Sequence, residues 1–310
     1  VPQSWMARAE CAALLAVPQN VIGPQSNKPT MGIVQDSLLG LHLLTLPGTV
    51  VTRSHFCRIV GTTVRTQKSI PVPALTIRDS RGESFAFWTG KQVFSKLLPT
   101  DLYMEPEKIH ADALDDALVI RAGQMLSGTL KKAHVGTASG GIVDVLCRDY
   151  GGYTCCRFFD DAQRLTHAFL LVRSHHVGIH DVMLNEEGHQ HVTERLVKAT
   201  HLCEEIQRAM ESEDVPPDVA ITAERSILRL LSKTLMQCGS VVNEHMNEGN
   251  AIRRMVGAGS KGTFINLSQI CAALGQQSLE GARIISERGR TLPCFDTNDL
   301  KLVGKDSFIS

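Results

Sequence analysis

The spacing of apolar residues between positions 192 and 242 constrains the fold more than any other feature of this sequence. Its first half alternates steps of four and three along the chain: Val192, Leu196, Ala199, Cys203, Ile206 and Met210. Its second half continues with similar steps: Ile227, Leu231, Leu235, Cys238 and Val242. Such a seam is typical of a helix that packs against another helix. Because the polar, proline-broken stretch ESEDVPPD (211–218) separates the halves, we expect an antiparallel helical hairpin over 191–246.

The rest of the chain mixes shorter helices and strands. Helical spacing recurs in three places: 5–16, 32–44 and 160–173. Residues 50–150 are mostly short and β-like, with two strands expected around Gly123 and one helix that starts after Thr89 as its N-cap. The segment 142–147 fits either a helix or a strand. This mixture predicts a fold of the α+β class.

Charge and cysteine content exclude several classes of protein. Lysine and arginine together equal aspartate and glutamate at 32 each, so any contact with nucleic acid has to be local. Nine cysteines with no CxxC pair fit free thiols in a reducing compartment better than a disulfide framework. No apolar run approaches the roughly 18 residues that a membrane span needs, so no membrane contact is expected.

One stretch departs from local neutrality. Residues 250–305 contain four acidic residues and eight basic ones. The basic residues are Arg253, Arg254, Lys261, Arg283, Arg288, Arg290, Lys301 and Lys305. A solvated arginine face is one interpretation of this stretch. A surface that attracts triphosphates or a nucleic acid backbone is the other.

The segment VGAGSKGTF (256–264) resembles a phosphate-binding loop at first sight. A Walker loop places its lysine directly after the last glycine, whereas Lys261 precedes Gly262 here. The residues before it, 250–256, are helical in character, so the strand that leads into such a loop is also missing. The sequence therefore predicts a break between two helices, in which Gly257, Gly259 and Gly262 allow close packing or positive φ angles.

Two groups of titratable residues invite comparison with metal sites. Histidines gather in one stretch, with a cysteine pair and a further histidine before it: His175, His176, His180, His189, His191, Cys155, Cys156 and His167. Their spacing matches no zinc ligand set, which favours surface histidines. The aspartates Asp112, Asp115 and Asp116 lie in an expected loop, and Asp160–Asp161 are expected to begin a helix. From the residues alone, the chain contains no complete catalytic centre.

Longer stretches carry a family resemblance, in this order along the chain: VPQSWMARAE (1–10), PQSNKPTMGIVQDSLLG (24–40), WTGKQ (88–92), GTASGGIVDVL (136–146), HHVGIHD (175–181), AGSKGTFINLSQICAALGQQSLEGARI (258–284) and RTLPCF (290–295). Together they resemble the largest subunit of multisubunit DNA-directed RNA polymerase. The polymerase II type of eukaryotes and its relatives in large DNA viruses are the most similar.

This resemblance implies an arrangement in three parts. We expect the end of a β-barrel active-site domain over 1–34, a mixed α/β pore domain over 35–178, and an α-helical hairpin funnel domain over 179–310. It also implies that both ends are cuts through a longer chain. The family's D-x-D-x-D loop, which binds the catalytic Mg²⁺, would precede Val1, and the bridge helix and trigger loop would follow Ser310. We therefore expect a part of a nucleotidyltransferase that is inactive alone.

The resemblance also assigns candidate site residues. Nucleotide entry through the pore would involve four residues of the last segments: Lys261, Gln276, Gln277 and Arg290. The motif PQSNKPTMGIVQDSLLG (24–40), hereafter the first motif, places Asn27, Gln35 and Asp36 on the wall of the active site. Turn capping is the plain alternative for Gln276 and Gln277.

Partners and location follow from the same resemblance. The implied partners are the other polymerase subunits, notably the second-largest, with NTPs, DNA template and RNA, and a transcript-cleavage factor at the funnel. The expected location is the nucleus, or host cytoplasm or virion for a viral enzyme. Two departures stand out: His180 replaces a family glycine, and the positions that match the family's amatoxin-binding residues are Ser232, Leu235 and Met236. These predict weak or absent amatoxin sensitivity.

Two functions from other classes remain as alternatives. The first is an independent nucleotide-binding protein that would use the glycine–lysine loop, but this loop lacks the Walker spacing. A helical interaction module would dock protein partners through the 191–246 hairpin, and this is compatible with a polymerase funnel.

Overall fold

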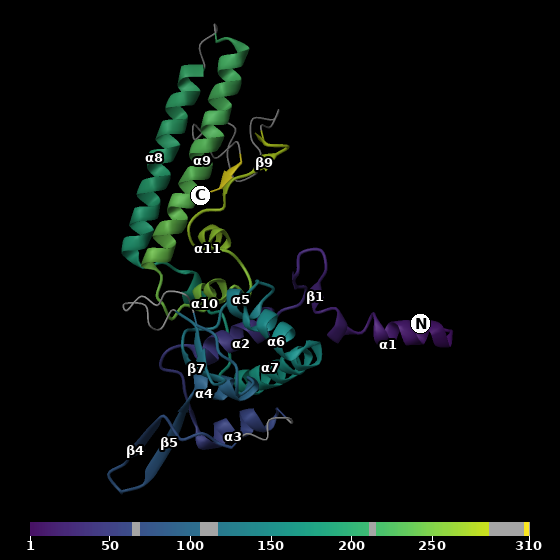
Figure 1. The fold of residues 1–310 in the computed structure, drawn as a ribbon. Helices are drawn as coiled ribbons and strands as arrows, with labels where there is room; N and C mark the ends of the chain where they lie inside the picture. The colour runs from purple at the N-terminus through teal and green to yellow at the C-terminus, as the bar shows by residue number, and fades with distance from the viewer. Residues whose placement is uncertain (64–68, 106–116, 211–214, 285–306, 310) are drawn as a thin grey trace. The chain divides into compact units, whose positions relative to one another are not determined.

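The chain folds into two compact units in a computed structural model that describes residues 1–63, 69–105, 117–210, 215–284 and 307–309 (Figure 1). The first unit contains Val1–His175 and Gly257–Lys261, and the second contains His176–Val256 and Gly262–Ser310. Within the described ranges, no helix is both long and apolar enough to cross a membrane. Both units mix helices with short strands, which confirms the α+β class, and the strands described form no closed barrel.

The first unit is built around α2 (Gln35–Thr45), whose residues from Leu38 onward are all buried. It packs against α7 (Gly152–Val172), which also contacts α6 (Ile142–Tyr150). The close approach of α2 to α7 requires Gly40, because a Cβ there would lie 2.1 Å from the Thr166 methyl group. The remaining helices of this unit are short: α1 (Trp5–Ala13), η1 (Val17–Gln19), α3 (Arg53–Gly61), α4 (Gly90–Phe94), η2 (Ser95–Leu97) and α5 (Lys132–Val135).

The strands of the first unit form three small antiparallel sheets. The largest has the order β3-β5-β4, from Val50–Thr52, Ser84–Thr89 and Leu75–Arg78, with Val51 opposite Trp88. Trp88 is buried against Phe56, with ring centroids 5.4 Å apart, and its indole donates to the Pro71 carbonyl at 2.8 Å. The other two sheets are hairpins: β1 (Ile22–Gly23) with β2 (Lys28–Pro29), and β6 (Val119–Arg121) with β7 (Gln124–Ser127).

Several expectations for this unit are confirmed. Thr89 caps α4 in a capping box with Gln92, and the two strands around Gly123 are β6 and β7. The ambiguous segment 142–147 is the helix α6.

Three expectations for this unit are wrong. The region 50–150 is less β-like than predicted, because α3 forms after the N-cap Thr52. Helix α7 begins eight residues before 160, because Cys155 and Phe158 extend its buried face toward the N-terminus. As a result, Asp160 and Asp161 lie in the middle of this helix and do not begin it.

The second unit is dominated by the helical hairpin of α8 (Glu186–Met210) and α9 (Pro217–His245), which run side by side in Figure 1. The predicted seam is confirmed: Val192, Ala199 and Cys203 are buried on α8, and Ile227, Leu231, Cys238 and Val242 on α9. The exposed side of α8 carries two ion pairs at i,i+4 spacing, Glu194–Lys198 at 3.8 Å and Glu204–Arg208 at 3.1 Å.

Shorter elements complete the second unit. They are η4 (Ile179–Val182), α10 (Ala251–Ala258, whose last two residues group with the first unit), α11 (Phe264–Cys271), β8 (Gly275–Gln276), β9 (Ser278–Leu279), β10 (Ala282–Arg283) and β11 (Phe308–Ile309). Leu267 of α11 packs with Val242 and Met246 at the end of α9. Phe308 of β11 packs with Cys203, Ile227 and Leu231 in the hairpin. The hairpin core is therefore extended by residues that follow it in the sequence.

Candidate functional site

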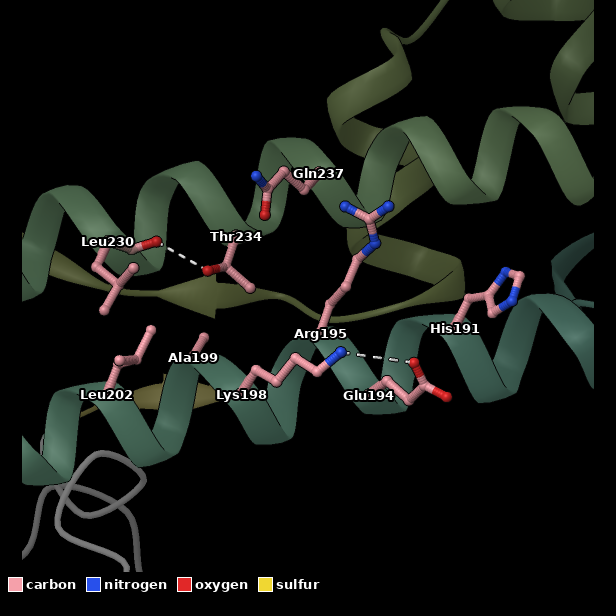
Figure 2. Close-up of a pocket in the computed structure, with 9 residues that line it drawn as sticks. All are labelled: His191, Glu194, Arg195, Lys198, Ala199, Leu202, Leu230, Thr234 and Gln237. Atoms are coloured by element: carbon pink, nitrogen blue, oxygen red, sulfur yellow. Dashed lines mark hydrogen bonds and ion pairs between the residues drawn. The ribbon is translucent and has the colours of Figure 1, made fainter.

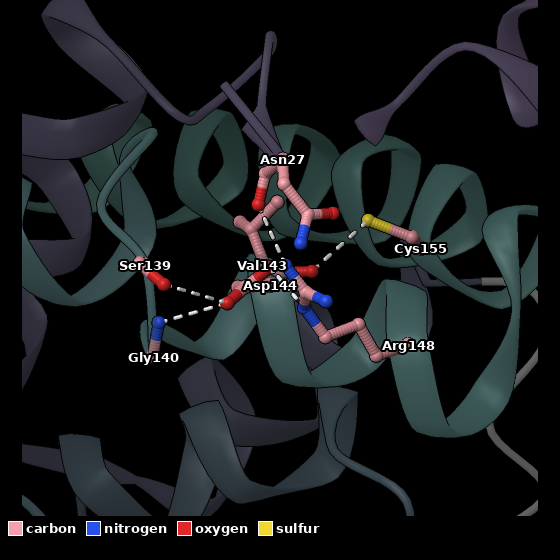
Figure 3. A network of polar contacts seen from close by, with 7 residues as sticks. All are labelled: Asn27, Ser139, Gly140, Val143, Asp144, Arg148 and Cys155. Atoms are coloured by element: carbon pink, nitrogen blue, oxygen red, sulfur yellow. Dashed lines mark hydrogen bonds and ion pairs between the residues drawn. The ribbon is translucent and has the colours of Figure 1, made fainter. Parts of the chain in front are cut away.

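A buried carboxylate in the first unit holds the first motif in place (Figure 3). The Asp144 side chain is 5% exposed and accepts hydrogen bonds from Gly140 N–H at 2.8 Å and Arg148 Nε at 2.7 Å. Arg148 in turn donates from Nη2 to the Asn27 carbonyl at 2.7 Å. Burial acts to raise the pKa of Asp144, but the Gly140 and Arg148 hydrogen bonds outweigh it and lower the pKa. Asp144 is therefore a structural anion.

This network positions Asn27, one of the three residues predicted for the active-site wall. Asn27 lies in the turn between β1 and β2 with φ at 51°, a left-handed conformation that asparagine tolerates well. Its main-chain oxygen accepts from Arg148, while the residue itself is exposed. The interaction with Arg148 was not predicted, although the i,i+4 spacing of Asp144 and Arg148 in a helix is a sequence signal for their pairing.

The other two wall residues lie together at the N-terminus of α2. Gln35 opens the helix with φ at 52°, and Asp36 stands in its first turn, where the helix dipole favours a negative charge. Both are exposed, and both line a hollow of about 400 Å³ with Phe159, Gln163 and His167 of α7. The structure therefore brings Gln35 and Asp36 to one polar depression.

A second buried carboxylate, Asp181, organises the HHVGIHD motif in the second unit. Its Oδ1 accepts from Ala251 N–H and its Oδ2 from Gly178 N–H, each at 2.9 Å. Asn250 donates to the Asp181 carbonyl at 2.8 Å. The hydrogen bonds from Ala251 and Gly178 lower the pKa of Asp181. Asp181 thus caps α10, a role that the sequence signalled only by an aspartate three residues after Gly178 of the motif.

The glycine–lysine stretch is the expected break between two helices. It separates α10 from α11, and Thr263 caps α11 in a capping box with Asn266. Gly259 and Gly262 both have φ at 76°, which confirms the predicted need for glycine, whereas Gly257 lies inside α10. Lys261 is exposed.

The remaining predicted pore residues are placed only in part. Gln276 lies in β8, and the Gln277 N–H donates to the Ser307 carbonyl at 3.0 Å, beside the pairing of β8 with β11. The Gln276 side chain donates from Nε2 to the Gln277 carbonyl at 2.8 Å, a local contact of the kind that turn capping predicts. Arg290 lies outside the described residues, as do Asp112, Asp115 and Asp116. Lys261 belongs to the first unit, whereas Gln276 and Gln277 belong to the second.

The local basic stretch is not a uniform solvated face. Arg253 donates from Nη1 to the Met246 carbonyl at 2.6 Å. The Arg283 side chain is 1% exposed and lies 3.5 Å from the Glu224 carboxylate. Both arginines are therefore used inside the second unit, and the interpretation of a solvated face is wrong for them. Four of the other basic residues lie outside the described ranges: Arg288, Arg290, Lys301 and Lys305.

A shallow hollow of about 410 Å³ follows the seam between α8 and α9 (Figure 2). Helix α8 lines it with His191, Glu194, Arg195, Lys198, Ala199 and Leu202, and α9 with Leu230, Thr234 and Gln237. In Figure 2, Arg195 extends from α8 toward α9. The amatoxin-related positions also lie on α9, where Ser232 and Met236 are exposed and Leu235 is half-buried.

The described residues offer no centre for Mg²⁺. Among them, no group of three or more histidine, cysteine, aspartate or glutamate side chains is placed to hold a metal ion. Their eight cysteines are free thiols, and burial raises the pKa of Cys155 to about 12 and that of Cys203 to about 11. These two thiols are protonated near neutral pH and are poor nucleophiles. The described residues therefore do not provide the ligand set of a catalytic metal ion.

Comparison with known proteins agrees with this architecture. Residues 20–182 match the family "RNA polymerase Rpb1, domain 3", and residues 207–309 match "RNA polymerase Rpb1, domain 4". Two relatives from Trypanosoma brucei brucei, DNA-directed RNA polymerase II subunits RPB1-A and RPB1-B, are each 32% identical over 309 residues. The match covers 96% of this chain and 17% of the length of each relative. The chain therefore belongs to the Rpb1 family, the largest subunits of RNA polymerase.

Proposed function

We propose that this chain forms the nucleotide-entry pore and funnel of the largest subunit of a DNA-directed RNA polymerase. The observation that carries the proposal is the match to two Rpb1 domains, 3 and 4, in chain order along nearly the whole sequence. The long α8–α9 hairpin supports it, because the funnel of this family is a helical hairpin and the hairpin follows the segment that resembles the pore.

In this proposal, residues 1–34 end the active-site domain, 35–178 form the pore and 179–310 form the funnel. Asn27, Gln35 and Asp36 then contribute to the wall of the active site, and the Asp144–Arg148 network holds Asn27 in place. Lys261, Gln276, Gln277 and Arg290 would meet nucleoside triphosphates in transit. The Mg²⁺ of the reaction would be bound by ligands elsewhere in the assembled enzyme.

The central experiment is templated UMP incorporation by a purified polymerase whose largest subunit contains this chain. We expect RNA synthesis by the assembled enzyme and none by the 310-residue chain alone. Primer extension by the chain alone would contradict the proposal, as would full activity of an enzyme from which this chain has been removed.

A substitution tests the entry role of Lys261. Lys261→Ala should raise the KM for NTPs with little change in kcat, because a lysine on the entry path attracts the triphosphate and speeds its association without contacting the reacting atoms. Lys233→Ala is the matched control, since Lys233 is also an exposed lysine and lies on α9. If the Lys261→Ala and Lys233→Ala enzymes have the same KM for NTPs, Lys261 does not contact nucleotides during entry.

The hairpin also supports a second role, as the docking site of a transcript-cleavage factor. Its hollow offers Arg195 and Lys198 beside the apolar Leu202 and Leu230, a mixture suited to a protein partner. An Arg195→Ala/Lys198→Ala enzyme should lose factor-stimulated RNA cleavage and keep RNA synthesis. Unchanged cleavage would exclude this face as the docking site.

Location and toxin response complete the proposal. Association with the second-largest subunit, the other polymerase subunits, DNA template and RNA is proposed for a nuclear enzyme, with host cytoplasm or virion as the location for a viral one. We also predict weak or absent amatoxin sensitivity from Ser232, Leu235 and Met236. Inhibition of transcription at low toxin concentration would contradict it.

A further inference from the structure

Two histidines from opposite arms of the hairpin meet where α8 begins and α9 ends. His191 stands in the second turn of α8, and His245 is the last residue of α9. Their ring centroids are 5.2 Å apart, with the planes at 75° to each other. The sequence had grouped His191 with its neighbours in the chain, whereas the fold pairs it with a residue 54 positions away.

The meeting depends on a glycine. Gly188 is buried one turn before His191, and a Cβ at this position would lie 2.8 Å from the His245 Cβ. Real Cβ atoms do not approach so closely, so any other residue would push the end of α9 away. Gly188 also donates its N–H to Asn185 Oδ1 at 2.8 Å, which fixes the start of α8.

The two imidazoles face each other through ring nitrogens. His191 Nδ1 lies 3.3 Å from His245 Nε2. This distance is long for a hydrogen bond, but an N–H of one ring that donates to the nitrogen of the other explains the contact. It also equals the separation of two nitrogen ligands in a tetrahedral metal site, because Zn–N bonds of about 2.0–2.1 Å place their nitrogens about 3.3–3.4 Å apart.

A carboxylate stands behind one of the rings. Glu187 Oε2 lies 3.9 Å from His245 Nδ1, on the ring atom that does not face His191. A carboxylate in this place favours the tautomer that carries its proton on Nδ1 and leaves the Nε2 lone pair free. The His245 side chain is only 17% exposed, so the protein packed around it restrains its ring. His191 is exposed, so an ion in solution can reach its ring nitrogen.

We propose that His191 Nδ1 and His245 Nε2 form a two-imidazole site for a divalent transition-metal ion of the Zn²⁺ class, with Glu187 as the positioning residue for His245. Imidazole ligands select zinc, copper, nickel and cobalt over magnesium. No described group of three or more His, Cys, Asp or Glu side chains is placed to hold a metal ion, so water completes the coordination. The bound ion would clamp the two arms of the hairpin and is independent of RNA synthesis.

The test is Co²⁺ and Zn²⁺ binding to the untagged 310-residue chain, measured by Co²⁺ absorption and by calorimetry with Zn²⁺. We expect one equivalent that disappears in the His191→Gln/His245→Gln variant, while the other ten histidines supply only background. Glu187→Gln should weaken binding by less than the roughly 10–100-fold that loss of a hydrogen-bonded carboxylate causes, because Glu187 Oε2 is 3.9 Å from His245 Nδ1. His189→Gln is the matched control, because His189 is exposed on the same helix and should leave binding unchanged.

Two results would overturn the proposal. One is binding that is as strong in the His191→Gln/His245→Gln variant as in the original chain, and the other is no saturable binding at all. His191→Gln alone guards against misfolding, because His191 is exposed, and far-UV circular dichroism checks each variant. As a second measurement, crystals soaked in Zn²⁺ should show an anomalous peak between the two nitrogens. Peaks only at other histidines would count against the site.

Discussion

Replacing Asp144 with alanine should lower the free energy of unfolding of the first unit by about 2–4 kcal/mol. The substitution removes a carboxylate that is 5% exposed and leaves the Gly140 N–H without its acceptor. It also frees Arg148, whose hydrogen bond to the Asn27 carbonyl in the β1–β2 turn then lacks its positioning partner. The loss therefore reaches the segment that carries the first motif.

The magnitude follows from the separate contacts. A hydrogen bond to a charged group contributes about 1.5–3 kcal/mol, and the part-buried bond from the Gly140 N–H to the Asp144 carboxylate is of this kind. The ion pair with Arg148 adds only about 0.5–1 kcal/mol, because the arginine side chain is 41% exposed and regains water when the pair is broken. Ser139 Oγ, at 3.4 Å, contributes little.

Tryptophan fluorescence during urea unfolding measures this loss. The chain has two tryptophans; Trp88 is 4% exposed and Trp5 is 83% exposed, so a Trp5→Phe background leaves a reporter inside the first unit. Asp149→Ala is the matched control, because Asp149 is an exposed aspartate on the same helix. If both variants unfold at the urea concentration of the parent, the Asp144 network does not stabilise this unit and the reasoning fails.

Further perturbations test the other contacts. Folding lowers the pKa of Asp144 and Asp181. The stability that these two carboxylates contribute is therefore complete above the unfolded-state pKa of about 4, and it is lost as pH falls through the lower folded-state pKa. Urea unfolding between pH 6 and 3 should show a fall in the free energy of unfolding that is smaller in the Asp144→Asn/Asp181→Asn variant. Asp181→Ala should cost about 2–4 kcal/mol, because the N–H groups it caps lose a charged acceptor, and circular dichroism at 222 nm should report the loss. Leu231→Ala should cost about 2–5 kcal/mol through a cavity in the hairpin core, whereas Met236→Ala, at a side chain 70% exposed, should stay within about 0.5 kcal/mol by the same measurement.

The hairpin shows what a sequence pattern can predict. Its seam repeats over many turns, so the apolar positions on α8 and α9 identify two helices and the face that each one buries. Local capping is equally readable, since Thr89 and its Gln92 partner act within a single turn. Gly259 and Gly262 were likewise predictable, because positive φ is a property of the residue itself.

Short or fully buried segments were harder to predict. Helix α3 buries only Phe56 and Ile59, too few to reveal a helical period. The start of α7 was missed because its buried face continues through cysteine and phenylalanine residues that fit a strand equally well.

The candidate site divides in the same way. The motif that contains Gln35 and Asp36 could be identified from the sequence, because a family resemblance is recognised in a continuous stretch of residues. The roles of Asp144 and Asp181 could not, since each depends on which backbone N–H groups the fold brings to a buried carboxylate.

The sequence by itself therefore determined the hairpin, its seam, the Thr89 cap of α4 and the Rpb1 family of this chain. Only the tertiary structure decided that Arg148 reaches the turn at Asn27, that Asp181 caps α10, and that His191 faces His245. The physical reason is range: helical period, capping and φ preference act within a few residues, whereas these contacts join residues 54 to 121 positions apart. Such pairs form only when packing of the surrounding helices holds them together.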